Sequence, residues 1–283
     1  MNKYTLQQIG VIFFLGITIF INALANIVRL NGKTTGEIAN QFPVYFVPAG
    51  YVFSIWSLIY VALIAFAVYQ ALPRNRMRSL IITSRIIFMV SCFANIVWIL
   101  LWHYGYITLT ILVMIVLLFS LLIIYTRVQR ISHIISVSDR WCVQKPFSLY
   151  LGWVTVATIS NMSVVLYVLG WQGGWLAPQI WSATMIIVAT IISALVIIPR
   201  KDWVYGLVIV WALIGIAVKF SSIPIIRNMS FAMVGVHVIL LGWIAWNQKP
   251  ILASTIVPSA QKRNIHGRKK KIKKTTRKKK VTV

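Results

Sequence analysis

Acidic residues are almost absent from this chain of 283 residues, which carries only Glu37, Asp139 and Asp202. It has two cysteines, Cys92 and Cys142, and four scattered histidines without the spacing of metal ligands. No acid, base and nucleophile can be combined from these residues. We therefore expect no enzyme, no metal site and no disulfide.

Apolar residues make up 59% of the chain, and the mean hydropathy is +0.84. A helix needs about 20 apolar residues to cross ~30 Å of hydrocarbon, where an open backbone N–H or C=O finds no partner. Eight stretches have this length, at residues 8–28, 49–72, 79–102, 106–125, 146–169, 177–198, 203–220 and 228–246. The sequence predicts an all-α integral membrane protein with about eight transmembrane helices.

Basic residues mark alternate connections between these stretches. They gather at the N-terminus, in the second, fourth and sixth connections, and after the last stretch. Lysine and arginine accumulate on the cytoplasmic side, so we expect a multi-pass cell-membrane protein with both termini cytoplasmic. The two longest connections, 29–47 and 126–145, show no folded pattern. The first stretch could also be a signal peptide, but Asn22 and Asn26, one helical turn apart, favour a helix inside a bundle.

The end of the chain differs from the rest. Residues 262–280 contain twelve lysines or arginines and no acid, so residues 249–283 are predicted to form a disordered polybasic cytoplasmic tail. Such a tail should contact anionic lipid headgroups. No aromatic residue is interleaved to stack on bases, which argues against a nucleic-acid partner.

Polar and aromatic residues recur at helical spacing in three stretches. The three stripes are Phe53, Trp56, Tyr60 and Ala67; Ser91, Asn95, Trp98 and Trp102; and Tyr150, Trp153, Ala157 and Asn161. Amide and indole N–H groups need partners in hydrocarbon, so the stripes should face the bundle interior. They could simply pack the helices together, which helix physics alone favours, or they could line a cavity for a flat, mostly apolar ligand.

The same residues carry a family resemblance. PAGYVFSIWSLIY (residues 48–60), FANIVW (93–98) and SLYLGWVTVATISN (148–161) resemble, in order, motifs of the second, third and fifth helices of the TspO/MBR family. These are the translocator proteins or tryptophan-rich sensory proteins. The resemblance covers about residues 7–170. Tyr51, Ile99 and Ser148 replace a tryptophan and two prolines that are usual in the family.

This resemblance implies a TspO-like five-helix bundle around a pocket that binds porphyrins, with residues 29–47 in place of the loop that closes over the ligand. The resemblance implies no covalent cofactor. It implies a non-covalently bound tetrapyrrole, either a porphyrin or haem, as the ligand. The position of Ala157 implies a possible homodimer contact. The ligand-binding residues implied are Trp56, Tyr60, Asn95, Trp98, Tyr150, Trp153, Ala157 and Asn161.

The chain should thus divide into a five-helix bundle at 1–170, three additional transmembrane helices at 171–248, and the tail. The predicted function is membrane binding, sensing or transport of a planar hydrophobic ligand, a tetrapyrrole by resemblance. The alternative is an uncoupled transporter (a facilitator) of another small hydrophobic molecule, because no carboxylate lies inside a stretch to couple transport to protons or cations.

The alternating charge makes a topology prediction. Reporter fusions after Lys145 and after Trp175 should lie on opposite sides of the membrane, because one apolar stretch separates them. An activity reporter that works only outside the cytoplasm measures this directly. Two fusions on the same side would contradict the number of spans.

Overall fold

A computed structural model describes residues 2–132, 134–171, 173–174 and 176–247. The predicted tail at 249–283 lies outside the described residues. Within them the regular secondary structure is helical, which confirms the all-α membrane fold. The α-helices are α1 (Lys3–Ala23), α2 (Thr35–Ala39), α3 (Ile55–Ala71), α4 (Ser79–His103), α5 (Ile107–Arg130), α6 (Val137–Asp139), α7 (Lys145–Val168), α8 (Pro178–Arg200), α9 (Trp203–Lys219) and α10 (Pro224–Asn247).

Short irregular turns extend several of these helices. A π-helical turn, Leu24–Val28, prolongs α1, and another, Arg140–Gln144, precedes α7. A 3₁₀ turn, Gly50–Ser54, leads into α3. Prolines begin α8 and α10 and occupy the first turn of α7, where their missing N–H costs no helical hydrogen bond.

Seven helical segments among the described residues are long and apolar enough to cross a membrane. They are Lys3–Val28, Gly50–Ala71, Ser79–His103, Ile107–Arg130, Val137–Val168, Pro178–Arg200 and Pro224–Asn247. The remaining predicted span, at residues 203–220, is also a helix, α9, but it has only 17 residues. At ~1.5 Å per residue α9 is about 25 Å long, shorter than the ~30 Å of a typical hydrocarbon core. It begins directly after Asp202 and ends at Lys219.

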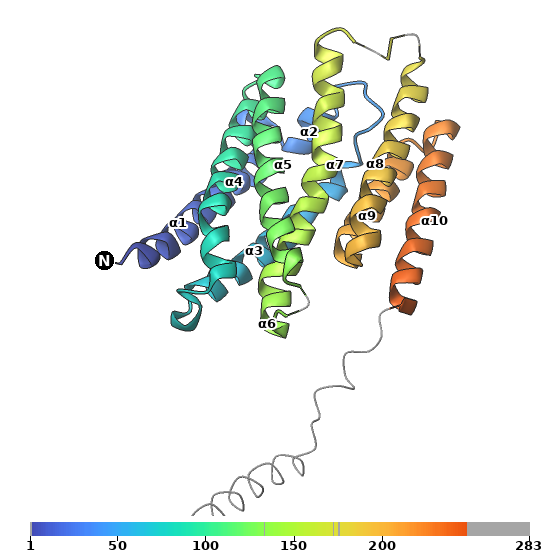
Figure 1. The fold of residues 1–283 in the computed structure, drawn as a ribbon. Coiled ribbons are helices and arrows are strands. Elements are labelled where there is room, and N and C mark those ends of the chain that lie inside the picture. Colours follow the sequence, from blue (N-terminus) through green and yellow to red (C-terminus); the bar gives the residue numbers. More distant parts are fainter. Residues whose placement is uncertain (1, 133, 172, 175, 248–283) are drawn as a thin grey trace, which may run out of the picture. The chain divides into compact units, whose positions relative to one another are not determined.

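The first five long helices close into a ring. Around it, α1 packs against α3, α3 against α7, α7 against α5, α5 against α4, and α4 against α1. Helices α8, α9 and α10 lie beyond α7, on the side away from α1 and α4 (Figure 1). Of these, α9 packs against α7 and the Gly50–Ser54 turn, and α8 packs against α9. Residues 1–244 form one compact unit, so the additional helices pack onto the ring instead of forming a unit of their own.

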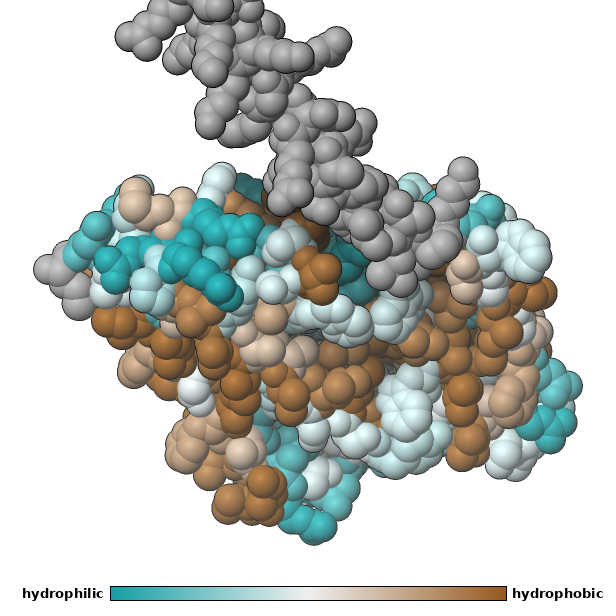
Figure 2. Space-filling model, turned by 90° about the horizontal axis from the view of Figure 1, so that it is seen from below, coloured by the Kyte–Doolittle hydropathy of each residue, from teal (hydrophilic) through white to brown (hydrophobic). Residues whose placement is uncertain are grey.

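Large apolar side chains point outward from the helices. Leu112, Val116 and Phe119 of α5, for example, are each about half exposed. Figure 2 shows hydrophobic residues over much of the face it views, with hydrophilic residues in separate clusters. Lipid tails are as apolar as leucine, so this surface is the one that a bilayer requires.

The interior, in contrast, contains paired polar groups. Arg85 of α4 is fully buried, and its guanidinium donates to the side-chain oxygen of Gln70 (2.9 Å) and to the carbonyl of Arg76 (2.9 Å). The Gln8 side chain of α1 donates to the backbone carbonyl of Gln70 (2.7 Å), and the Gln70 side chain donates to the backbone carbonyl of Gln8 (3.2 Å). Carbonyl dipoles therefore stabilise this buried cation, and the hydrogen bonds hold α1, α3 and α4 together at one end of the ring.

Two of the three carboxylates are buried, and both lie at helix starts. Asp139 closes a capping box with Ser136 at α6 and accepts a bidentate pair from Arg78, at 2.6 and 2.7 Å. Asp202, before α9, accepts from Tyr125 of α5 (2.9 Å) and from Ser148 of α7. The expectation that residues 126–145 show no folded pattern was thus wrong, because these residues include α6 and its capping box.

Helix α9 approaches the entrance to α3 very closely. A Cβ atom at Gly215 would lie 2.2 Å from Cγ2 of Val52, which is fully buried. The carbonyl of Gly215 accepts from the N–H of Ala49 (3.2 Å), and the indole of Trp211 donates to the carbonyl of Val52 (3.1 Å). Glycine allows this backbone contact, which fixes the segment 48–53 against α9.

This contact predicts the effect of one methyl group. Gly215→Ala should destabilise the folded protein by about 1–3 kcal/mol, because the stiff Val52 side chain cannot move away without shifting the backbone. Gly235→Ala in α10 is the matched control, since a Cβ there meets nothing within 4 Å. Unfolding in mixed micelles measures both. Equal stability of the two variants would show that the contact is not tight.

Candidate functional site

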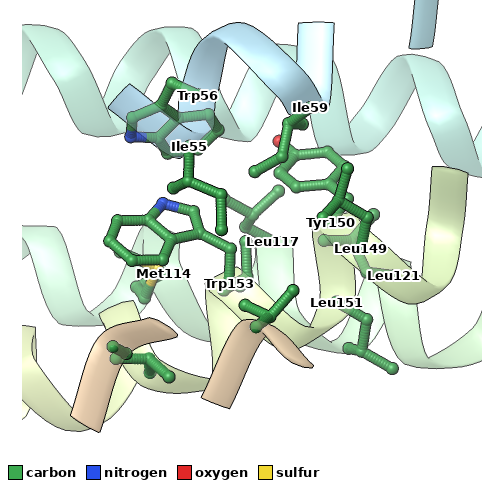
Figure 3. Packing of buried hydrophobic residues seen from close by; sticks show 14 of the residues in the cluster. Ile55, Trp56, Ile59, Met114, Leu117, Leu121, Leu149, Tyr150, Leu151 and Trp153 are labelled. Carbon is green, nitrogen blue, oxygen red and sulfur yellow. The ribbon is translucent and has the colours of Figure 1, made fainter. Parts of the chain in front are cut away.

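The aromatic residues of the second and fifth stretches meet inside the ring. Trp56 stacks on Tyr60 with the ring centroids 5.6 Å apart and the planes 18° apart. Its edge contacts are with Tyr150 (5.9 Å) and Trp153 (6.3 Å), both from α7. Figure 3 shows Trp56, Tyr150 and Trp153 packed with aliphatic residues, among them Ile55. The structure therefore brings together four of the residues predicted from the sequence.

The third stretch adds a second aromatic pair. Trp98 stacks on Trp102 at 5.5 Å, and both are buried. Between them and α7 lies a space of only about 30 Å³, lined also by Trp153, Ala157 and Asn161. That volume is about the share of one water molecule in the liquid. In this conformation the space holds no planar ligand, because the aromatic side chains fill it.

The two asparagines of the stripes connect helices. Asn95 accepts from the amide of Asn22 in α1 (2.8 Å) and donates to the hydroxyl of Tyr150 in α7 (3.2 Å). Asn161 of α7 donates to the hydroxyl of Thr110 in α5 (2.8 Å). Both asparagines are nearly inaccessible, so each satisfies polar groups that lipid could not. The interpretation of the asparagines as helix-packing residues is consistent with these contacts.

A larger cavity lies on the other side of Trp56. It has a volume of about 550 Å³ and is bounded by the end of α1, by α2 and by the start of α3. Trp56 and Tyr60 line it, together with Asn22 and Asn26. The eight predicted residues thus separate into three groups. Trp56 and Tyr60 line the large cavity, Trp98, Trp153, Ala157 and Asn161 line the 30 Å³ space, and Asn95 and Tyr150 line neither.

Two polar atoms at this cavity lack a protein partner. The side-chain oxygen of Asn22 and the hydroxyl of Tyr60 are buried without a hydrogen bond to any part of the chain that the structure describes. The indole N–H groups of Trp98 and Trp153, at the smaller space, have none there either. Each such group costs free energy unless a water or a ligand meets it.

The mouth of the large cavity is formed by the first connection. Thr34 and Glu37 form a capping box at the start of α2, and Glu37 pairs with Arg29 at 3.5 Å. The Thr34 N–H donates to the Glu37 carboxylate (2.8 Å) and, with the Arg29 charge, lowers the pKa of that carboxyl below its usual value. Glu37 is therefore ionised at neutral pH. We expected residues 29–47 to show no folded pattern. That expectation was wrong, because these residues include α2.

Sequence reasoning missed several residues of this cavity. Asn22 and Asn26 were recognised as one helix face but not as cavity residues, and Glu37 and Asn40 were not considered as cavity residues at all. The pattern Thr34-x-x-Glu37 is a readable start signal for a helix, and it could have revealed α2. That α2 then packs against the end of α4 and the Gly50–Ser54 turn depends on contacts that no local pattern indicates.

Comparison with protein families gives one match. A family model described as TSPO-like protein matches residues 8–244, which is most of the chain. The chain belongs to this family. The match includes the α8–α10 region as well as the ring, so it extends well beyond the 7–170 region in which the motifs were recognised.

Membership of this TSPO-like family supports a multi-pass membrane protein that binds or transports a hydrophobic ligand. Members are in general binding or transport proteins and not enzymes. No curated protein and no solved structure gave a match to the chain.

The hydrogen bonds of Asn95 predict a stability effect. Asn95→Ala removes two interhelical bonds worth about 0.6–1.7 kcal/mol each in a membrane protein, so the variant should lose roughly 1–3 kcal/mol. Tyr150→Phe removes only one of them and should lose about half as much. Unfolding with increasing detergent denaturant measures both. A stable Asn95→Ala protein would show that the asparagine does not hold α1, α4 and α7 together.

Proposed function

We propose that this TSPO-like protein binds a planar hydrophobic ligand of the tetrapyrrole class in the 550 Å³ cavity between α1, α2 and α3. A volume of this size falls within the ~300–1,000 Å³ of typical small-molecule sites. The lining combines the stacked pair of Trp56 and Tyr60 with a few amides, the composition expected for a flat ligand that has polar groups at its edge.

One observation carries this proposal. The Asn22 oxygen and the Tyr60 hydroxyl lack partners within the described chain, and both residues line the same cavity beside an aromatic face. Both atoms are buried beneath the cavity wall, so a ligand bearing a hydrogen-bond donor near Asn22 and an acceptor near Tyr60 would satisfy them after a rotation of those side chains. Because the surroundings are apolar, these bonds would fix the orientation of the ligand.

The small space behind Trp56 is an extension of the site in this proposal. Phe53 lines both the large cavity and the 30 Å³ space, and its ring lies 5.8 Å from that of Trp153. Rotation of the Phe53 side chain would join the two volumes. Trp98 and Trp153 then contact the ligand only after this opening, whereas Trp56 and Tyr60 line the large cavity without it.

The orientation in the membrane belongs to the same proposal. We place both termini on the cytoplasmic side of the cell membrane. The connections between α3 and α4 and between α5 and α7, with their flanking turns, carry the most arginines and lysines, and Arg200 and Lys201 mark the connection between α8 and α9. Alternation of the helices puts all three on one side. The cavity mouth at α2 would then face away from the cytoplasm.

Porphyrin titration tests the binding site. Detergent-purified protein should bind added protoporphyrin with quenching of indole fluorescence, and Trp56→Ala should weaken binding by about 0.5–1.5 kcal/mol, or two- to tenfold, through lost stacking. Tyr60→Phe, which keeps the ring, should weaken it through the hydroxyl alone. Trp246→Ala is the control, because that side chain is 90% exposed.

The interior tryptophans distinguish two versions of the site. If Trp98→Ala and Trp153→Ala weaken binding as much as Trp56→Ala, the ligand enters the opened interior. If only Trp56 and Tyr60 matter, the large cavity is sufficient. If the Trp56→Ala protein folds and binds porphyrin with the same affinity as the wild type, the pocket lies elsewhere. Wild-type protein that binds no porphyrin at micromolar concentration would instead favour the facilitator of another hydrophobic molecule.

A further inference from the structure

A second cavity lies outside the ring and involves an additional helix. It is a groove of about 700 Å³ between α3, α7 and α9. The α3 side is formed by residues such as Leu58, Val61 and Ala65, and the α9 side by Trp203, Leu207 and Trp211. Nearly all of its surface is apolar. The groove shares Ser54 with the ligand cavity described above but lies on the opposite face of α3.

The groove is open toward the bilayer. Leu58 and Val61 on one wall and Leu207 on the other are each about half exposed or more. These helices pass through hydrocarbon, so whatever fills the groove comes from the hydrocarbon phase. An empty apolar groove would forfeit dispersion contacts on both walls, and a lipid chain can supply them.

The length of the groove matches one leaflet. From Trp203 to Trp211 is eight residues of α9, or about 12 Å along the helix. One leaflet contributes half of the ~30 Å hydrocarbon core, or about 15 Å. The groove therefore runs over most of the depth of one acyl chain.

One end of the groove is cationic. Lys145, at the start of α7, is the one charged residue among the described residues that line it. Its ammonium lies 3.7 Å from Oδ1 of the buried Asp202 and 4.7 Å from the centre of the Trp203 ring. Trp141 lies at the same end and is largely exposed. A lysine with two tryptophans at the end of an apolar groove is the arrangement expected where acyl chain meets headgroup.

The ion pair holds the lysine in place without using up its hydrogen-bonding capacity. Asp202 accepts from Tyr125, Gln129 and Ser148 through its other oxygen, Oδ2, and is therefore fixed. At 3.7 Å, the Lys145 ammonium is attracted to Oδ1 but does not donate a hydrogen bond to it. Among the described residues no acceptor lies within hydrogen-bond distance of its N–H donors, and with 14% of the side chain exposed they can meet an acceptor at the end of the groove.

We propose that this groove binds an anionic phospholipid, with one acyl chain between α3 and α9 and the headgroup phosphate at Lys145. The proposal uses none of the residues that would contact the planar ligand, and it stands or fails separately from the proposed function. It also gives α9 a role beyond packing, because one wall of the groove consists of α9.

Bromine quenching tests where the lipid lies. The full chain in nanodiscs should show stronger tryptophan quenching with phosphatidylglycerol brominated on its acyl chains than with phosphatidylcholine carrying the same chains. Ala65→Phe should reduce the difference, by filling the groove, to what the basic tail alone produces. Val68→Phe, on an exposed position of α3 that does not line the groove, should keep it. The basic tail is common to all variants, so its attraction for anionic lipid cancels.

The headgroup contact has its own test. Lys145→Met should weaken the phosphatidylglycerol component about fivefold, as expected for the loss of one charge near the membrane surface, and Lys145→Arg should keep it. Lys145→Met leaves the buried Asp202 without its counter-ion, and it can fail to fold for that reason. The double variant Lys145→Met/Asp202→Asn removes both charges and should show the same fivefold loss.

Four results would overturn the proposal. They are equal quenching by the two lipids, unchanged quenching in Ala65→Phe, loss of the difference between the two lipids when porphyrin is added, and a change of oligomeric state in Ala65→Phe. The third would assign the groove to the planar ligand, and the fourth to a second copy of the chain. If the double variant folds and still prefers phosphatidylglycerol, Lys145 does not contact the headgroup, and the proposed position of the phosphate is wrong.

Discussion

The structure depends on one constraint, which is that hydrocarbon offers no partner to a polar group. A buried amide, hydroxyl or charge is therefore stable chiefly where it finds a partner within the protein, and the arrangement of the helices follows from the pairs that form. Asn95 joins α1, α4 and α7, Asn161 joins α7 to α5, and Arg85 joins α4 to the end of α3. The apolar residues, which are equally stable against lipid and against protein, follow this framework and do not define it.

The sequence predicted what depends on periodicity. Stretches of apolar residues gave the long helices, and the stripes at three- and four-residue spacing correctly placed Trp56, Trp153 and Trp98 inside the ring. The three motifs gave the family. Capping boxes at Thr34 and Ser136 were also present as local signals, so α2 and α6 could have been predicted from the same rules.

The separation of the site into a large cavity and a small space could not be predicted from the sequence. The spacing of residues along one helix does not show how far away the neighbouring helix lies. Trp56 and Trp153 belong to stripes of equal quality, yet one lines a cavity of about 550 Å³ and the other a space of about 30 Å³. The burial of Asp202 was hidden for a similar reason. Its position between two apolar stretches suggested an exposed loop, whereas its Oδ2 atom accepts hydrogen bonds from α5 and α7, from residues 54 to 77 positions away.

The contact between Gly215 and Val52 has a consequence for how the protein is made. The segment 48–53 leaves the ribosome more than 150 residues before α9, and it reaches its final hydrogen bonds at Ala49 and Val52 only when α9 has entered the membrane. A chain stopped after α7 would contain all the helices of the ring and still leave the entrance to α3 unfinished. The entrance to α3 is therefore completed from the C-terminal side of the chain, after the five helices of the ring have been made.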